Sequence, residues 1–195
     1  MIAIIDYKAG NIASLQNALE RLGQSCVITS KPKEILSADG VIFPGQGRAG
    51  SAMLELRKTE IDKIIPQITK PFLGICLGMQ LLAEYSEEDA TKCLGIFRGA
   101  CRKFPSTVKT PHIGWNKVKF MKASPLTVGI PDETYLYFVH SYYVDDSKER
   151  VMGTTSYGFD FPAMMQKNNF FTVQFHAEKS GEQGLRLLNN FCKLC

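Results

Sequence analysis

The chain has 195 residues, of which 45% are hydrophobic and 22% charged, and its formal net charge is +4. This is long enough for a substantial core, and the composition is that of a globular protein rather than a disordered or fibrous one. The basic residues are scattered without runs, which argues against nucleic-acid binding, and the N-terminal apolar stretch ends after five residues, too short for a signal peptide or membrane span. We therefore expect a single domain over residues 1–195, located in the cytoplasm and not associated with a membrane.

The first half of the chain alternates strand-like and helix-like segments. Strands are predicted at residues 1–6, 25–30, 39–45 and 70–76. Helices are predicted at residues 11–23, 49–58, 61–68 and 77–85. This alternation predicts βαβ units, which build a mainly parallel sheet with helices on both faces.

The second half is richer in strands. They are predicted at residues 97–104, 116–121, 134–144, 150–157, 162–169 and 170–176, and a helix over 181–195 closes the chain. Turn-like dipeptides separate these strands, which indicates antiparallel or mixed pairing. The predicted fold class is therefore a three-layer α/β fold: a mainly parallel central sheet with helices on both faces, plus an antiparallel or mixed second half.

A single cysteine stands between the fourth strand and the helix that follows it. Cys76 has Gly74 two residues before it and Gly78 two residues after it. A buried free cysteine often packs in the hydrophobic core as a small apolar residue. The flanking glycines favour a different role, because they permit a sharp turn and the close approach of other groups. A strand, a tight turn, an exposed nucleophile and a helix form the nucleophile elbow, where the helix N-terminus favours the thiolate.

Other chemistry-bearing residues fall at neighbouring strand ends. The segment FPGQGRAG follows the third strand, and ligands of open α/β sheets bind beyond the carboxyl ends of the strands. Of the three histidines, His176 is followed two residues later by Glu178, so a strand would place both side chains on one side. A lone His-x-Glu is typical of a surface turn, but together with Cys76 it supplies a nucleophile, a base and a carboxylate that orients the base.

The six cysteines do not predict a disulfide framework, because nothing in the sequence indicates secretion. Cys192 and Cys195 form a lone C-x-x-C motif without a second motif or a nearby histidine, so no metal site is predicted. We interpret both as reduced thiols on the terminal helix, and no cofactor is expected.

Taken together, the motifs DYKAGNIASLQNALERLG, FPGQGRAGSAM, GICLGMQLL, PHIGWN, YFVHSYY and QFHAEKS resemble class I, triad-type glutamine amidotransferases over nearly the whole chain. GICLGMQ marks the class. PHIGWN and YFVHSYY, in this order, resemble the motifs of one subfamily, the glutaminase subunits of imidazole glycerol phosphate synthase, which serve histidine biosynthesis.

The resemblance implies hydrolysis of glutamine to glutamate and ammonia through a thioester on Cys76, with His176 as base and Glu178 as its orienting carboxylate. Backbone N–H groups of Leu77 and of the 44–47 loop, at Gly47, would form the oxyanion hole. The resemblance also places further residues around the bound glutamine: Gln80, Glu88, His140, Ser141 and Tyr142.

Ammonia must not escape to water, and the resemblance implies a heterodimer with a (βα)₈-barrel cyclase through which the ammonia is channelled to form imidazole glycerol phosphate and AICAR. The residues implied to face this partner are Asn11, Trp115, Asn116, Tyr137 and Lys179. Trp115 is the only tryptophan, and tryptophan and tyrosine are frequent interface anchors. Family glutaminases are nearly silent until the partner holds its substrate, so a reorienting oxyanion peptide is a plausible switch.

The chain departs from the family pattern at two positions. The family usually has an aliphatic residue where this chain has Gln46, which bears on the tuning of the oxyanion strand. It usually has proline at Ala177, and proline would fix the backbone between His176 and Glu178. Neither position supplies a catalytic side chain.

Three alternatives remain at this point. A paralogous glutaminase could feed ammonia to a partner that amidates a surface sugar, and the two departures slightly favour this possibility. A freestanding cysteine hydrolase, such as a γ-glutamyl hydrolase, would act without a partner and would not need PHIGWN or YFVHSYY. A non-catalytic binding domain would not need Cys76, His176 and Glu178, so their presence argues against it.

Overall fold

The computed structural model describes residues 1–8, 12–145 and 150–195. A nine-stranded sheet has the order β2-β1-β3-β4-β13-β12-β11-β8-β9, and a four-stranded sheet has the order β10-β7-β5-β6. The strands of the large sheet are β1 (Ile2–Ile5), β2 (Cys26–Thr29), β3 (Gly40–Phe43), β4 (Phe72–Ile75), β8 (His112–Phe120), β9 (Thr134–His140), β11 (Val151–Ser156), β12 (Asp160–Lys167) and β13 (Phe170–Val173). The small sheet comprises β5 (Tyr85–Ser86), β6 (Thr91–Lys92), β7 (Ala100–Lys103) and β10 (Tyr142–Asp145).

Six α-helices accompany the sheets within the described ranges: α1 (Ile12–Arg21), α2 (Pro32–Ser37), α3 (Ala49–Lys58), α4 (Ile61–Ile64), α5 (Leu77–Gln80) and α6 (Gly181–Cys192). Short 3₁₀ turns lie at Ile65–Gln67, Glu88–Ala90, Pro125–Thr127 and Ala177–Lys179. None of the helices in these ranges is long and apolar enough to cross a membrane.

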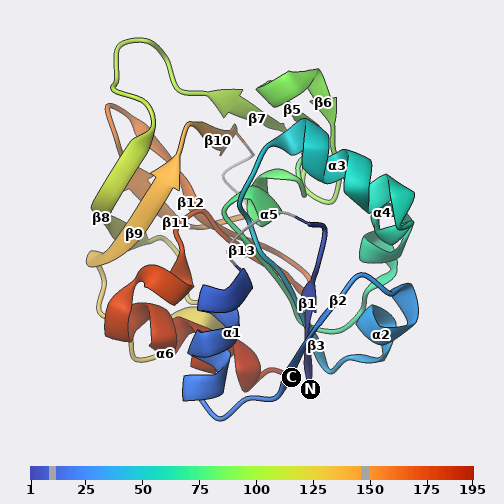
Figure 1. The fold of residues 1–195 in the computed structure, drawn as a ribbon. Coiled ribbons are helices and arrows are strands. Elements are labelled where there is room, and N and C mark those ends of the chain that lie inside the picture. Colours follow the sequence, from blue (N-terminus) through green and yellow to red (C-terminus); the bar gives the residue numbers. More distant parts are fainter. Residues whose placement is uncertain (9–11, 146–149) are drawn as a thin grey trace.

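The predicted three-layer fold class is confirmed. Strands β2, β1, β3, β4 and β13 pair in parallel, and every residue of β1, β3, β4 and β13 is buried. Such continuous burial is expected when helices cover both faces of a parallel sheet. Helices α1 and α6 cover one face and α2, α3 and α4 the other (Figure 1). Each face has its own hydrophobic cluster, with Leu19 and Phe191 in one and Leu56 and Ile61 in the other.

From β13 onward the large sheet is antiparallel, as the second half predicted. One difference concerns residues 134–144, which were expected to form one strand. They form β9 in the large sheet and β10 in the small sheet, and the chain changes sheets at Ser141. The small sheet requires this break, because β10 pairs with β7 whereas β9 pairs with β8.

The helix predicted at residues 77–85 is also shorter than expected. Only Leu77–Gln80 are α-helical, and the chain reaches β5 at Tyr85. Leu81, Leu82 and Ala83 are fully buried, so their apolar run reflects core packing and not a longer helix. The prediction did not include α2 or the two short strands β5 and β6.

The arrangement of the sheet brings three chain segments to one edge. Strands β3, β4 and β13 are neighbours and run in the same direction, so their carboxyl ends at Phe43, Ile75 and Val173 lie side by side. The residues that follow these ends are the 44–47 loop, Cys76 and the segment that leads to His176.

Candidate active site

Cys76 forms the turn between β4 and α5 with an unusual backbone, φ 51° and ψ −108°. Positive φ is uncommon for a residue with a side chain and is found mostly at turns or functional sites. A Cβ atom on Gly78 would lie 2.1 Å from the carbonyl oxygen of Phe43, and one on Gly45 would lie 2.0 Å from that of Ile75. Glycine is therefore required at both positions, because the 44–47 loop and the turn at Cys76 pack backbone against backbone.

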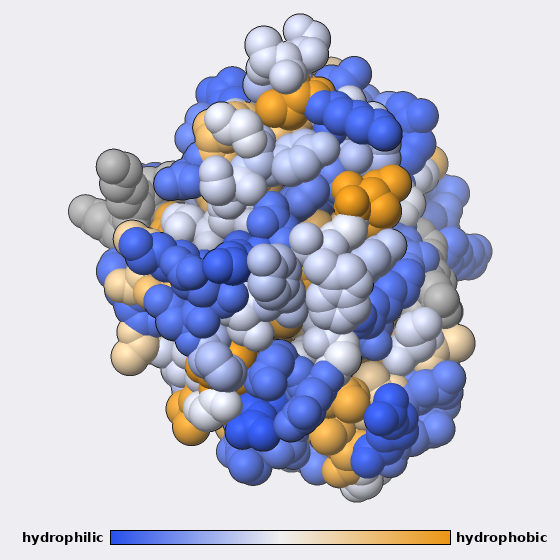
Figure 2. All heavy atoms as spheres, turned by 90° about the vertical axis from the view of Figure 1, so that its left-hand side faces the viewer, coloured by the Kyte–Doolittle hydropathy of each residue, from blue (hydrophilic) through white to orange (hydrophobic). Residues whose placement is uncertain are grey.

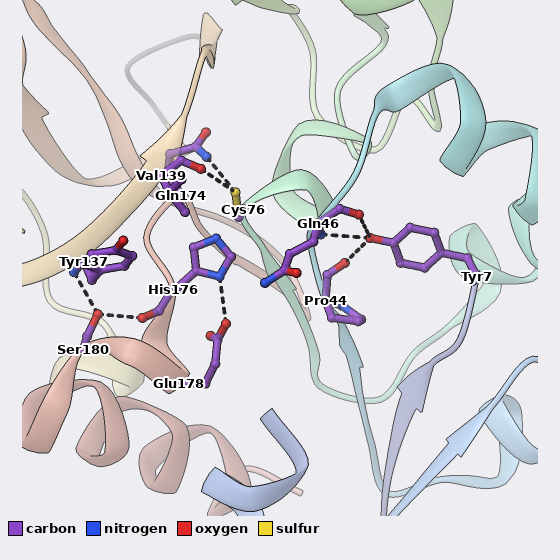
Figure 3. A network of polar contacts seen from close by, with 10 residues as sticks. All are labelled: Tyr7, Pro44, Gln46, Cys76, Tyr137, Val139, Gln174, His176, Glu178 and Ser180. Atoms are coloured by element: carbon purple, nitrogen blue, oxygen red, sulfur yellow. Dashed lines mark hydrogen bonds and ion pairs between the residues drawn. The ribbon is translucent and has the colours of Figure 1, made fainter. Parts of the chain in front are cut away.

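His176 and Glu178 lie next to the cysteine and form a tight pair. Nδ1 of His176 lies 2.7 Å from Oε1 of Glu178, and their side chains are only 2% and 5% exposed. Because Nδ1 is held by the carboxylate, the second ring nitrogen turns toward Cys76 (Figure 3). Burial alone would lower the pKa of His176, but its interactions with Cys76 and Glu178 outweigh burial and raise it to about 10. The arrangement thus favours the protonated imidazole of His176.

His176 and Glu178 were expected to lie on one side of a strand. In the structure, a turn brings them together instead. Strand β13 ends at Val173, and His176 stands before a 3₁₀ turn at Ala177–Lys179. The turn is fixed to β9, since His176 N–H donates to the Tyr137 carbonyl at 2.8 Å. The Ser180 hydroxyl donates to the His176 carbonyl at 2.6 Å and accepts from Tyr137 N–H at 2.9 Å.

The thiol itself has polar neighbours on the side away from the 44–47 loop (Figure 3). Gln174 Nε2 donates to Sγ of Cys76 at 3.6 Å, and Sγ lies 3.9 Å from the Val139 carbonyl oxygen. Gln174 is fully buried, and its Oε1 accepts from Gln80 Nε2 at 3.1 Å. Gln80 is therefore connected to the thiol through Gln174, and it also donates to the Tyr142 carbonyl at 2.9 Å.

A cavity of about 420 Å³ opens over the thiol. The predicted catalytic, oxyanion and substrate-binding residues that line it are Gly47, Cys76, Leu77, Gln80, Glu88, His140, Ser141, Tyr142 and His176. Glu178 lies behind His176, outside the cavity lining. Lys179, predicted to face a partner, also contributes to the wall, so the cavity reaches the predicted partner side.

Two of these residues also have structural contacts. Glu88 Oε2 accepts the N–H of Ala49 at 2.8 Å, which caps the first turn of α3. His140 is buried and connects through its Nε2 to Nδ1 of His112 at 3.0 Å, and its Nδ1 lies 2.7 Å from the Tyr142 carbonyl. Burial lowers the pKa of His140 to about 3 and that of His112 to about 4, so both rings are neutral at pH 7.

Sequence reasoning missed Tyr7, Gln174 and Ser180. Tyr7 follows β1 at the same sheet edge, and its hydroxyl donates to the Pro44 carbonyl at 2.8 Å. Gln174 stands two residues before His176, and alternate residues of a strand point to the same side. This spacing could therefore have predicted that Gln174 lies near the site. Nothing local in the sequence marks Ser180, whose contacts span 43 positions to Tyr137.

The residues predicted to face a partner are mostly gathered on β8 and β9. Trp115 is 55% exposed and pairs across the strands with Tyr137, the two rings lying 6.0 Å apart. Asn116 is partly buried and donates to the Ser156 carbonyl at 2.9 Å. Asn11 lies outside the described residues. Within those residues, no group of three or more His, Cys, Asp or Glu side chains is placed to hold a metal ion.

An elbow cysteine beside a buried histidine–carboxylate pair is the arrangement of a thiol-dependent amide hydrolase. Residues 3–195 match the model of the family described as Glutamine amidotransferase class-I. The chain belongs to this family of enzymes, as the sequence motifs indicated.

Curated relatives match the chain over its full length. The chain is 48% identical to imidazole glycerol phosphate synthase subunit HisH 1 of Methanococcus maripaludis and 49% identical to subunit HisH of Methanocaldococcus jannaschii, with 100% of each chain covered. It is 46% identical to subunit HisH of Dehalococcoides mccartyi, covering 100% of this chain and 97% of the relative.

Solved structures share the fold at low sequence identity. PurLQS from Thermotoga maritima aligns with a TM-score of 0.77 at 17% identity, over 98% of this chain and 97% of that chain. A second structure, described as a glutamine amidotransferase, aligns with a TM-score of 0.76 at 17% identity, over 100% and 98%.

Proposed function

We propose that this chain is the glutaminase subunit of imidazole glycerol phosphate synthase. It hydrolyses glutamine to glutamate and ammonia and supplies the ammonia to a cyclase subunit that makes imidazole glycerol phosphate and AICAR in histidine biosynthesis. The observation that carries the proposal is the elbow cysteine beside the His176–Glu178 pair, in a chain 46–49% identical over its length to curated HisH subunits. Residues 1–195 form one domain in this proposal.

The chemistry assigned to the three side chains is nucleophilic catalysis. Cys76 gives its proton to His176 and attacks the carboxamide carbon of glutamine as thiolate. His176 then delivers the proton to the departing nitrogen, so ammonia leaves and a glutamyl thioester remains on Sγ. Water, deprotonated by His176, attacks the thioester, which breaks the S–C bond and releases glutamate. Glu178 keeps the imidazole oriented and stabilises its protonated form throughout.

Each tetrahedral intermediate carries an oxyanion that needs N–H donors. The N–H of Leu77 is a candidate because the first N–H groups of a helix have no acceptor within it. The second candidate is Gly47 of the 44–47 loop, which lines the cavity. Loss of one such donor typically lowers the rate by about 10²–10³. Helix α5 has a single turn, so His176 is the main charge partner of the thiolate in this mechanism.

The cavity provides a glutamine site in this proposal. Its wall combines the partly buried carboxylate of Glu88, the buried Gln80 and His140, and the backbone around Ser141 and Tyr142. A charged carboxylate suits the α-ammonium group of glutamine, and backbone groups suit its carboxylate and amide.

The partner is a (βα)₈-barrel cyclase that binds the side of the molecule formed by β8 and β9, in the cytoplasm. Trp115, Asn116, Tyr137 and Lys179 face it, together with Asn11. Support comes from the exposed aromatic surface and from Lys179, which joins that surface to the wall of the cavity. Ammonia released at Cys76 therefore has a short route to the partner.

The test is glutamate release from glutamine by the chain alone and with the cyclase subunit and its nucleotide substrate from the same genome. We expect low activity alone, strong stimulation in the complex and loss of both in Cys76→Ser. High activity without a partner would indicate a freestanding cysteine hydrolase. A folded chain that stays silent with the cyclase would point to a different ammonia-consuming partner.

A further inference from the structure

The buried side chain of Gln174 connects the thiol of Cys76 to the wall of the cavity. Gln174 follows the end of β13 and is fully buried, and its backbone N–H donates to the Ala163 carbonyl of β12 at 2.9 Å. Its Nε2 lies 3.6 Å from Sγ of Cys76 (Figure 3), and its Oε1 lies 3.1 Å from Nε2 of Gln80. A buried amide needs such partners, because burial of a polar group without hydrogen bonds is costly. The sheet therefore fixes the backbone of Gln174, and these two contacts fix its amide.

The direction of both contacts follows from the Tyr142 carbonyl, which can only accept a hydrogen bond. Nε2 of Gln80 lies 2.9 Å from that oxygen, so the NH₂ group of Gln80 must face it. The second hydrogen of the same NH₂ group points to Gln174, which must therefore turn its oxygen toward Gln80. This orientation leaves the NH₂ group of Gln174 facing Sγ. The side chain of Gln174 is thus a hydrogen-bond donor to the sulfur, and only one orientation of its amide satisfies all three contacts.

An N–H donor on the sulfur favours the charged form of the nucleophile. The Val139 carbonyl oxygen, 3.9 Å from Sγ, can accept from a thiol S–H but repels a thiolate. A thiolate gains from a donor instead, and hydrogen bonds to ionised groups are stronger than those between neutral groups. The proposed reaction needs the thiolate twice. It attacks the carboxamide carbon, and it leaves again when the S–C bond of the thioester breaks and the sulfur keeps the electron pair.

We propose that Gln174 is a further catalytic residue, which stabilises the Cys76 thiolate through its side-chain N–H group. This inference rests on the proposed glutaminase function and adds one group to its mechanism. The described residues that line the cavity do not include Gln174, so it acts on the sulfur and does not contact the bound glutamine. Substitution of Gln174 should therefore change kcat and leave KM nearly unchanged.

The first experiment compares Gln174→Met with wild type and with Asn190→Leu, each in the complex with the cyclase and its nucleotide. Methionine keeps the length of the glutamine side chain and removes its N–H groups. Asn190 is the matched control, because its buried amide also donates, to the carbonyls of Leu126 and Val128, but lies outside the cavity lining. We expect the kcat of Gln174→Met to fall about 10-fold to 100-fold, the range for loss of one hydrogen bond to a charged group, with KM within about twofold. Asn190→Leu should keep the kcat and KM of wild type.

A second readout needs neither glutamine nor the partner. Iodoacetamide alkylates thiolates, and mass spectrometry of the digested protein gives the rate at Cys76 separately from the other cysteines. At pH 7, Cys76 of Gln174→Met should be alkylated about threefold to tenfold more slowly than that of wild type, because the smaller thiolate fraction is partly offset by higher nucleophilicity. A merely structural role predicts the opposite, since looser packing around this 6% exposed thiol would speed alkylation.

The two readouts separate a failure of this inference from a failure of the proposed function. If the kcat of Gln174→Met equals that of Asn190→Leu, or if its Cys76 is alkylated as fast as that of wild type or faster, the role of Gln174 is wrong. If wild type releases no glutamate with the cyclase but alkylation still slows in Gln174→Met, the proposed function is wrong and the hydrogen bond to the thiolate stands.

The hydrogen bond can also be tested without a variant at Gln174. NMR compares the side-chain amide signals of Gln174 in wild type and in Cys76→Ala, which removes the acceptor. We expect the Nε2 hydrogen that donates to Sγ to move to lower frequency in Cys76→Ala, while the amide signals of Asn190 stay in place. Unchanged signals of Gln174 would contradict donation to the sulfur.

Discussion

At the scale of single residues, the hydrogen bonds through His140 and His112 have only one consistent direction. The Tyr142 carbonyl can only accept, so His140 carries its proton on Nδ1 and its Nε2 accepts from Nδ1–H of His112. Nε2 of His112 then accepts from the side-chain amide of Asn116 at 3.3 Å. Protonation of either ring would place two N–H donors opposite each other. The hydrogen bonds are therefore consistent with the lowered pKa values of His140 and His112. The chain of bonds runs from the cavity wall to the predicted partner side.

This network predicts acid sensitivity. Both histidines have a lower pKa in the folded state than the ordinary 6.5, so their contribution to stability is complete above pH 6.5. It declines as the pH falls from there toward the folded values of about 4 and 3, because the unfolded chain binds the protons first. Each histidine should lower the free energy of unfolding by about 2 kcal/mol between pH 7 and pH 5.

Two measurements check this expectation. Urea unfolding at pH 7 and pH 5 gives the change in stability, and nitrogen chemical shifts of the imidazoles give the protonated atom and the titration midpoint. Titration of either ring near pH 6.5 in the folded protein would contradict the assignment.

At the scale of elements, the junction of β4 and α5 depends on backbone contact with β3. A Cβ atom on Gly78 would lie 2.1 Å from the Phe43 carbonyl oxygen, which belongs to a buried strand and cannot move aside. Gly78→Ala gains about 1 kcal/mol of helix propensity but overpacks this contact, which typically costs about 1–3 kcal/mol or more. Because the contact is with fixed backbone, we expect a net loss of about 2 kcal/mol in the free energy of unfolding.

The matched control is Gly50→Ala in α3, where the nearest atoms belong to the Asp89 side chain at 3.0 Å. That side chain can shift, so the gain in helix propensity is kept, and the free energy of unfolding should stay the same or rise by up to about 1 kcal/mol. Both values come from denaturant unfolding. Equal stability of the two variants would show that the junction tolerates a side chain at Gly78.

Some elements of the fold and the site were predicted correctly from the sequence, and others were not. The alternating first half and the turn at Cys76 were predictable, because buried parallel strands are short apolar runs and glycines mark close contact. The shift of the chain from β9 to β10 at Ser141 was not, because the second sheet exists only through pairing with β7 far along the chain. The His176–Glu178 pair was predicted from strand alternation, but a 3₁₀ turn held by Ser180 brings them together. Tyr7 was missed because its partners are backbone groups 37 and 39 positions away.

At the scale of the whole molecule, the β8–β9 face is unusually apolar for a surface. Ile113, Trp115 and Tyr135 are 60%, 55% and 54% exposed, and they point outward from adjacent strands. Figure 2 looks onto this side, where orange and pale residues interrupt the hydrophilic surface. Lys117 stands over the Tyr135 ring at 5.8 Å and pairs with Glu133, which gives the face a charged border. An apolar centre with a polar rim is the usual anatomy of a protein interface.

Trp115 should contribute most to binding at this face, because a large, rigid aromatic side chain is exposed at its centre beside Tyr137. Trp115→Ala should weaken binding of the cyclase subunit by about 30-fold or more, the effect of an interface anchor worth about 2 kcal/mol. The stability of the isolated subunit should change by less than about 0.5 kcal/mol, because the side chain is largely exposed.

Leu54→Ala is the control, since Leu54 is 52% exposed on α3, away from β8 and β9. Calorimetric titration of cyclase into each variant gives Kd, and glutamate release at saturating cyclase separates docking from catalysis. If Trp115→Ala and Leu54→Ala bind with equal Kd, the β8–β9 face is not the docking surface, whereas a raised Kd with full activity at saturation assigns Trp115 to docking alone.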